Sequence, residues 1–257
     1  MVSARGRSQK QWQQREKAAG SRTWAALYQG RPTPDTGNLF PVDKWARYTQ
    51  PLYVVRPDGT RVIPSITRDR GELCQSWDFT FKDTEGSDYV VGQVWYRRGP
   101  DAFLLDQVRG RMGFNESVQA MLDMTARWPQ AYAKFVEDKA NGPAIMNALR
   151  KMVGGLIPVE PEGSKSARAV AITPFVESRN VWLPDPIALR DKGIECAWVT
   201  DLTDEARDFP GGAHDDTVDA LTQAVHRLLL VQIIDDTVVD DEDLFDDDEA
   251  LPWAASY

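Results

Sequence analysis

Three groups of acidic residues, far apart in the chain, have the residue types needed to bind hard metal ions. Asp78 lies in Ser76-Trp-Asp-Phe-Thr80, Glu137 and Asp138 close Phe135-Val-Glu-Asp-Lys139, and Asp215 and Asp216 lie in His214-Asp-Asp-Thr-Val-Asp-Ala220. Mg²⁺ and Mn²⁺ prefer carboxylate and water oxygens. Two such ions, about 4 Å apart, can cut a phosphodiester, one activating the attacking water and the other stabilising the leaving oxygen. The pattern predicts a metal-dependent DNA nuclease.

Each group also has an ordinary structural interpretation. Asp78 alone could be a strand residue facing solvent, since charged residues are mostly exposed. Glu137 and Asp138 could belong to a turn that precedes a helix, and a single acid at position 215 would be a common helix cap. Two adjacent acids followed by Asp219 exceed what a cap needs, and Asp216 and Asp219 share a helix face. The three groups together therefore carry more weight than any one of them.

The order of apolar segments predicts an α/β fold that could bring these groups together. We expect strands at residues 72–81, 88–97, 102–108, 131–136 and 156–159, and helices that begin at Asn115, at residues 141–143, and over 164–177, 199–209 and 215–230. Three consecutive strands followed by alternating helices and strands predict a mixed β-sheet flanked by helices, with an antiparallel meander at one side and parallel crossovers at the other. This is the strand plan of a ribonuclease-H-like fold.

Two features of this plan favour a site at one end of the sheet. Alternation along the first strand places Asp78 on the face opposite Trp77 and Phe79. Ligand sites in α/β sheets gather beyond the carboxyl ends of strands, where Glu137 and Asp138 are expected.

Composition excludes several other classes of protein. The chain has 257 residues, 42% of them hydrophobic, enough for a sizeable core. We expect no membrane span or signal peptide, because no long apolar run is present. Two cysteines and two histidines make a zinc site of the Cys/His kind a poor explanation, so a bound metal should be held by oxygen.

The net charge of −9 is unevenly distributed. Residues 235–249 contain ten Asp or Glu and no Lys or Arg, so the rest of the chain carries +1 (−9 + 10). The first 22 residues contain six basic residues and one acid. We therefore predict three parts: a basic lead-in over 1–70, the nuclease domain over 71–231, and an acidic, disordered tail over 232–257.

An ordered set of motifs resembles the nuclease domain of tailed-phage terminase large subunits. The segments that carry this resemblance are residues 75–82, 87–92, 136–142, 163–168 and 209–220. Upstream, residues 22–32 and 37–40 resemble the segment that joins the packaging ATPase to the nuclease in that family. The resemblance spans roughly residues 20 to 230.

The resemblance implies cutting of concatemeric double-stranded viral DNA during genome packaging, in the host cell cytoplasm. Carried over by motif, the catalytic and metal-binding carboxylates are Asp78, Glu137 and Asp216, with Asp215 as an accessory ligand and Asp138 as the alternative to Glu137. Lys139, Lys165 and Arg168 would face the DNA backbone, or be ordinary solvated cations. The implied partners are a packaging ATPase domain or subunit, a small terminase subunit and the portal of the procapsid.

One feature of the family is missing. No phosphate loop of the form Gly-x4-Gly-Lys-[Ser/Thr] occurs, because Gly163-Ser-Lys-Ser166 lacks the upstream glycine. We expect no ATP hydrolysis by this chain alone. Two alternatives stay open: another ribonuclease-H-like nuclease of the resolvase or transposase type, and a non-catalytic docking module of the packaging motor.

Overall fold

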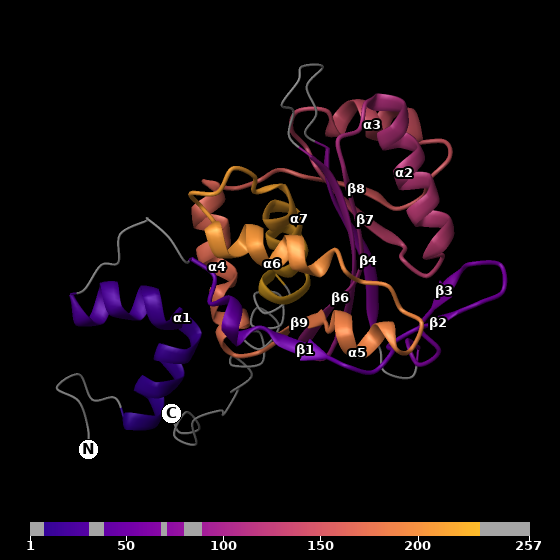
Figure 1. Cartoon of the computed structure of the whole chain (residues 1–257). Helices are drawn as coiled ribbons and strands as arrows, with labels where there is room; N and C mark the ends of the chain where they lie inside the picture. The colour runs from indigo at the N-terminus through magenta and orange to yellow at the C-terminus, as the bar shows by residue number, and fades with distance from the viewer. Residues whose placement is uncertain (1–7, 31–38, 68–70, 80–88, 232–257) are drawn as a thin grey trace, which may run out of the picture.

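The fold is a layered α/β arrangement in which a central sheet has helices on both faces (Figure 1). The computed structural model describes residues 8–30, 39–67, 71–79 and 89–231. The acidic segment 232–257, and the ends of two expected strands at residues 80–81 and 88, lie outside the described residues. No helix in the described ranges has both the length and the apolar character that crossing a membrane requires.

The main sheet is mixed, as predicted, with strand order β1-β9-β6-β5-β4-β7-β8. Its strands are β1 (Ala46–Tyr48), β4 (Glu72–Phe79), β5 (Val90–Arg98), β6 (Asp101–Gly110), β7 (Ala133–Glu137), β8 (Leu156–Val159) and β9 (Val181–Pro184). β4, β5 and β6 form the antiparallel meander, which lies in the middle of the sheet and not at one side as expected. β7 joins β4 in parallel and β8 joins β7 in parallel, while β9 joins β6 in parallel. β2 (Val54–Val55) and β3 (Arg61–Val62) form a separate antiparallel hairpin.

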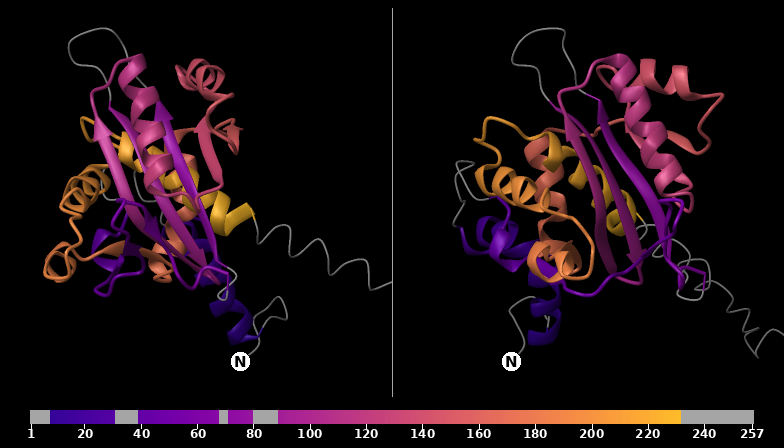
Figure 2. Two further views of the ribbon diagram at one scale, coloured as in Figure 1. Left: turned by 90° about the vertical axis from the view of Figure 1, so that its right-hand side faces the viewer. Right: turned by 45° about the vertical axis from the view of Figure 1, so that its right-hand side comes forward.

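The helices divide between the two faces of the sheet. They are α1 (Gln9–Gln29), α2 (Phe114–Arg127), α3 (Gly142–Leu149), α4 (Lys165–Glu177), α5 (Pro186–Arg190), α6 (Val199–Asp208) and α7 (Asp216–Val225), with α7 continued by a π-helical turn, His226–Leu230. Figure 2 shows α4, α6 and α7 on one side of the sheet and α2 and α3 on the other.

Two apolar cores follow from this layering. One core packs the α4, α6 and α7 side chains against the sheet, and includes Trp95, Leu104 and Leu221. The other packs α2 and α3 against the opposite face, and includes Trp77 and Met121. The sheet is therefore covered on both sides, which explains the nearly continuous burial of β4, β5 and β6.

The folded unit includes part of the segment predicted to be a basic lead-in. β1 pairs in parallel with β9 at the edge of the main sheet. Phe40 and Trp45 belong to the α7-side core, and Tyr53 and Ile63 belong to the other. Residues 39–66 thus pack on the same sheet as residues 71–231.

Candidate active site

Asp78 and Glu137 lie next to each other at the carboxyl ends of two neighbouring parallel strands. β4 and β7 pair in register as far as Trp77 and Val136, and the next residues along are Asp78 and Glu137. Adjacent strands are about 4.8 Å apart. The register therefore brings together two carboxylates that are far apart in the sequence.

Both carboxylates belong to the sheet face that α7 covers. Ser76, two residues before Asp78, donates from its hydroxyl to the Ala220 carbonyl of α7 at 2.8 Å. Phe135, two residues before Glu137, packs against the α7-side core. Side chains two residues apart in a strand share a face, so Asp78 and Glu137 also lie on the α7 side.

The aromatic neighbours of Asp78 lie on the other face, as alternation predicts. The Trp77 and Phe79 rings stack with centroids 5.0 Å apart, and both belong to the core under α2 and α3. Asp78 is only 5% exposed. The interpretation of Asp78 as a solvent-facing strand residue is therefore wrong.

Asp216 is the first residue of α7 and lies close to the end of β4. One carboxylate oxygen accepts a hydrogen bond from the Tyr89 backbone N–H at 3.1 Å, and Asp216 is 3% exposed. Tyr89 immediately precedes β5, whose first residue pairs with Phe79. The start of α7 thus sits over the end of the sheet that carries Asp78 and Glu137.

Asp219, one turn further along α7, is buried and forms the centre of a partly exposed ion-pair cluster. The Lys165 ammonium lies 2.6 Å from Asp219 and 2.7 Å from Asp215, and the Arg168 guanidinium lies 3.1 Å from Asp219. Both cations come from the first turn of α4. We call these four residues the α4–α7 cluster.

Burial and like charge act on the acids near this cluster. Burial raises the pKa of Glu137, with Asp219 adding to the shift and Arg168 opposing it. Burial likewise raises the pKa of Asp219, although Lys165 opposes that shift. Burial alone would lower the pKa of Lys165, but its hydrogen bonds to Asp215 and Asp219 raise it above its ordinary value. The acids of this region therefore lie close enough to influence one another.

A hollow of about 270 Å³ opens beside these groups. Glu137, Arg168, Asp219, His226 and Arg227 line it, together with residues of the segment after β8. The hollow combines acidic and basic side chains, which suits a ligand that carries both a cation and a phosphate.

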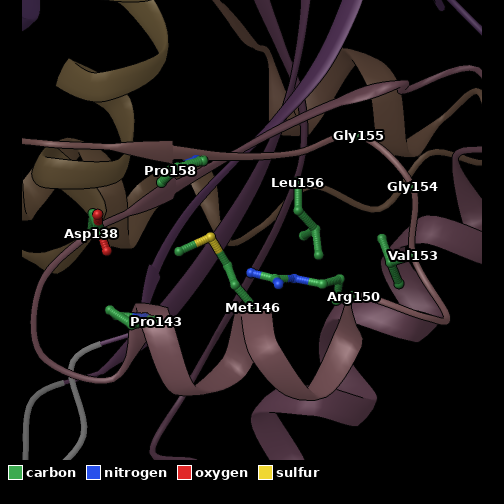
Figure 3. A pocket seen from close by; sticks show the side chains of 9 residues that line it. All are labelled: Asp138, Pro143, Met146, Arg150, Val153, Gly154, Gly155, Leu156 and Pro158. Atoms are coloured by element: carbon green, nitrogen blue, oxygen red, sulfur yellow. The ribbon is translucent and has the colours of Figure 1, made fainter.

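Asp138, the alternative to Glu137, lines a different hollow. This cavity, of about 480 Å³, is lined by Asp138, by Met146 of α3 and by Arg150, the residue after α3. Figure 3 shows Asp138 at one side of it, with Met146 and Arg150 between α3 and β8. Because the Asp138 N–H donates to the Val159 carbonyl, the pairing with β8 continues past Glu137 and fixes the two acids on opposite sides. The geometry brings Glu137, and not Asp138, to the α7 side.

Comparison with known families identifies the fold. The model for the terminase RNaseH-like domain matches residues 75–228, which is more than half of the 257 residues. This chain belongs to that family. A search of curated proteins found no match.

Solved structures of large terminases have a similar fold. The large terminase of one thermophilic bacteriophage superposes with a TM-score of 0.59 at 10% identity, covering 87% of this chain and 53% of that protein. The large terminase nuclease of a second thermophilic phage, G20c, superposes with a TM-score of 0.50 at 18% identity, covering 74% of this chain and 98% of that one. The chain thus spans about half the length of the first of these large terminases.

The donor set of this terminase-type domain fits a hard divalent cation. Every candidate ligand is a carboxylate, and Asp78 and Asp216 are buried on the same side of the sheet. As the side chains lie, no group of three or more His, Cys, Asp or Glu in the described part of the chain is close enough to hold a metal. Lys165 and Arg168 neutralise Asp219 instead. Metal binding would therefore require side chains to turn within a backbone arrangement that already brings them together.

The three cations predicted to face DNA occupy different positions. Lys139 is exposed in the loop after β7. Lys165 is half-exposed at the rim of the α4–α7 cluster, whereas Arg168 is 15% exposed and pairs with Asp219. Two of the three therefore contact carboxylates of α7.

Two residues near the site were not assigned a role from the sequence. From the sequence, Asp219 is predicted only to share a helix face with Asp216. Its ion-pair partners in α4 lie about 50 residues earlier in the chain. Glu205, in α6, accepts hydrogen bonds from the backbone N–H groups of Thr217 and Val218. A local signal for Glu205 exists, since it falls three residues after Leu202 on the buried face of α6.

Proposed function

We propose that this chain is a metal-dependent endonuclease that cuts concatemeric double-stranded viral DNA during genome packaging. The observation that carries the proposal is that Asp78 and Glu137 share the sheet face that α7 covers, while Asp216 begins α7 at the same end of the sheet. Membership of the terminase RNaseH-like domain family supports DNA as the substrate.

Asp78, Glu137 and Asp216 are the proposed metal ligands, with Asp215 as an accessory. Bound divalent cations supply the Lewis-acid chemistry that phosphodiester hydrolysis needs, which makes a histidine or lysine base unnecessary. Carboxylate donors favour Mg²⁺ or Mn²⁺, and we propose two ions. The G20c large terminase nuclease, similar in fold, has a structure with bound zinc.

The chain's own cations would orient the DNA. Lys165 is half-exposed beside the hollow, so its ammonium can turn from the carboxylates to a phosphate oxygen. Arg168 lines the same hollow and is held in place by Asp219. Lys139, exposed near Glu137, would contact the backbone further out. Such contacts give an affinity that falls as salt rises.

The test is cutting of supercoiled plasmid by purified protein with EDTA, Mg²⁺ or Mn²⁺. We expect cutting only with metal, and its loss in Asp78→Ala and Asp216→Ala. A matched pair sharpens the assignment: Glu137→Gln should abolish cutting, whereas Asp138→Asn, the adjacent acid on the other side of the sheet, should retain it. Equal loss in both variants would refute Glu137 as the ligand.

The packaging setting is also a proposal. Similarity to large terminases supports a packaging ATPase domain or subunit, a small terminase subunit and the portal as partners, in the host cell cytoplasm. If wild-type protein cuts under no metal, the assay is repeated with the ATPase partner. Continued absence of cutting would favour a docking module that binds without catalysis.

A further inference from the structure

The first turn of α7, which presents Asp216, is capped by a residue from another helix. The N-cap residue, Asp215, makes no capping hydrogen bond with its side chain. Glu205 of α6 supplies the acceptor instead: one carboxylate oxygen lies 2.7 Å from the Thr217 N–H and 3.4 Å from the Val218 N–H. A carboxylate at this position satisfies free N–H groups and complements the positive end of the helix dipole.

Glu205 is itself held by the sheet through Arg109. The Arg109 guanidinium lies 3.3 Å from the second carboxylate oxygen of Glu205, whose side chain is 5% exposed. The same guanidinium lies 3.6 Å from the centroid of the Tyr89 ring. Tyr89 is the residue whose backbone N–H bonds Asp216. One side chain therefore contacts both groups that fix the start of α7.

Arg109 lies at the same level of the sheet as Asp78. The register pairs Asp78 of β4 with Val91 of β5, and Val91 with Arg109 of β6. Residues paired across adjacent strands share a face, so Arg109 lies on the α7 side, two strands from Asp78. Fixing α7 to Arg109 therefore fixes the position of Asp216 relative to Asp78.

We propose that Glu205 and Arg109 are positioning residues that hold Asp216 in place for metal binding. The inference rests on the proposed function. Glu205 is not itself a metal ligand, because its two oxygens are directed to the α7 backbone and to Arg109. Residues that orient a metal ligand typically change metal affinity or activity by about 10–100-fold when removed.

The experiment measures plasmid cutting as a function of metal concentration, together with the rise in Tm that metal causes. Glu205→Ala removes the cap and the ion pair, and should raise the metal concentration for half-maximal cutting about 10–100-fold. Glu205→Gln keeps an acceptor for the Thr217 N–H but loses the charge, so its shift should be smaller. Arg109→Lys keeps the charge but loses the planar contact with Tyr89, and should also show a shift. If Glu205→Ala does not fold, Glu205→Gln and Arg109→Lys are measured in its place.

Asp204→Asn is the matched control, because Asp204 is the neighbouring acid of α6 and pairs with Arg207 at the exposed surface. It should match wild type in both readouts. Folded Glu205 variants with the metal dependence of wild type would overturn the inference and leave the proposed function intact. So would a loss of rate in Glu205→Ala that is equal at every metal concentration. Wild-type protein that neither cuts nor gains stability with metal would overturn the proposed function, and this inference with it.

Discussion

Gly142, the first residue of α3, lies against the backbone of Glu137 so closely that a methyl group does not fit. A Cβ added there would lie 2.0 Å from the Glu137 carbonyl oxygen. A real Cβ essentially never comes closer than 3.0 Å to such an atom, so Gly142→Ala must separate the two by at least 1.0 Å (3.0 − 2.0). The atom in contact is backbone, and so the end of β7 that carries Glu137 and the start of α3 have to move apart.

The expected effect on stability is a loss of about 1–3 kcal/mol, the usual cost of overpacking. For a domain of this size that loss lowers Tm by roughly 2–12 °C. The expected effect on cutting is larger, because a displacement of about 1 Å at a catalytic group can reduce the rate about 100-fold.

The assay compares plasmid cutting and thermal unfolding of Gly142→Ala with those of Gly154→Ala. An added Cβ at Gly154 would meet no atom within 4 Å, so this control should retain wild-type cutting and stability. If Gly142→Ala cuts DNA at the wild-type rate, the close contact with Glu137 does not position the carboxylate, and the reasoning is refuted.

Three further predictions concern the same region. Burial raises the pKa of Glu137 above its unfolded value, so its stabilising contribution is complete below about pH 4 and is lost as pH rises through the folded pKa. Glu137→Gln should therefore raise the Tm of metal-free protein at pH 7 but not at pH 4, and an equal change at both pH values would contradict this. Lys165→Met should lower the free energy of unfolding, measured in urea, by about 1 kcal/mol, because buried Asp219 loses one of its two cations while half of the Lys165 side chain is already exposed. The control Lys139→Met should leave the free energy of unfolding unchanged. Gln223→Ala should lower the free energy of unfolding by about 1–3 kcal/mol, because the Gln223 amide donates to three acceptors on β4 and β7 at 2.9–3.4 Å. An unchanged free energy of unfolding would show that Gln223 does not anchor α7 to the sheet.

The sequence was sufficient for the parts of the fold that follow from local patterns. The alternation of residues in β4 correctly predicted that Asp78 and Trp77 lie on opposite faces of the sheet. The sequence Asn141-Gly-Pro143 correctly marked the start of α3. The expected helix start at Asn115 was wrong: α2 begins at Phe114, and the Glu116 carboxylate accepts a hydrogen bond from the Gly113 N–H.

What the sequence did not predict depends on contacts between distant segments. β9 and β1 are four and three residues long, too short to show a strand period, and they form because each finds a partner in the sheet. The pairing of Lys165 with Asp219 joins α4 to α7 and leaves no local pattern. The cap that Glu205 provides could not be predicted either, because helix-capping patterns in sequence concern only the few residues next to a helix end.

The order of the strands has a consequence for the synthesis of the chain. Asp78 and Glu137 belong to strands that can pair once residue 137 has emerged from the ribosome, but α7 comes almost 80 residues later (216 − 137 = 79). Since α7 covers the face that carries both acids, a growing chain holds an incomplete site until α7 docks. Under the proposed function, a chain whose α7 has not yet emerged would be unable to cut DNA, because Asp216 would be absent from the site.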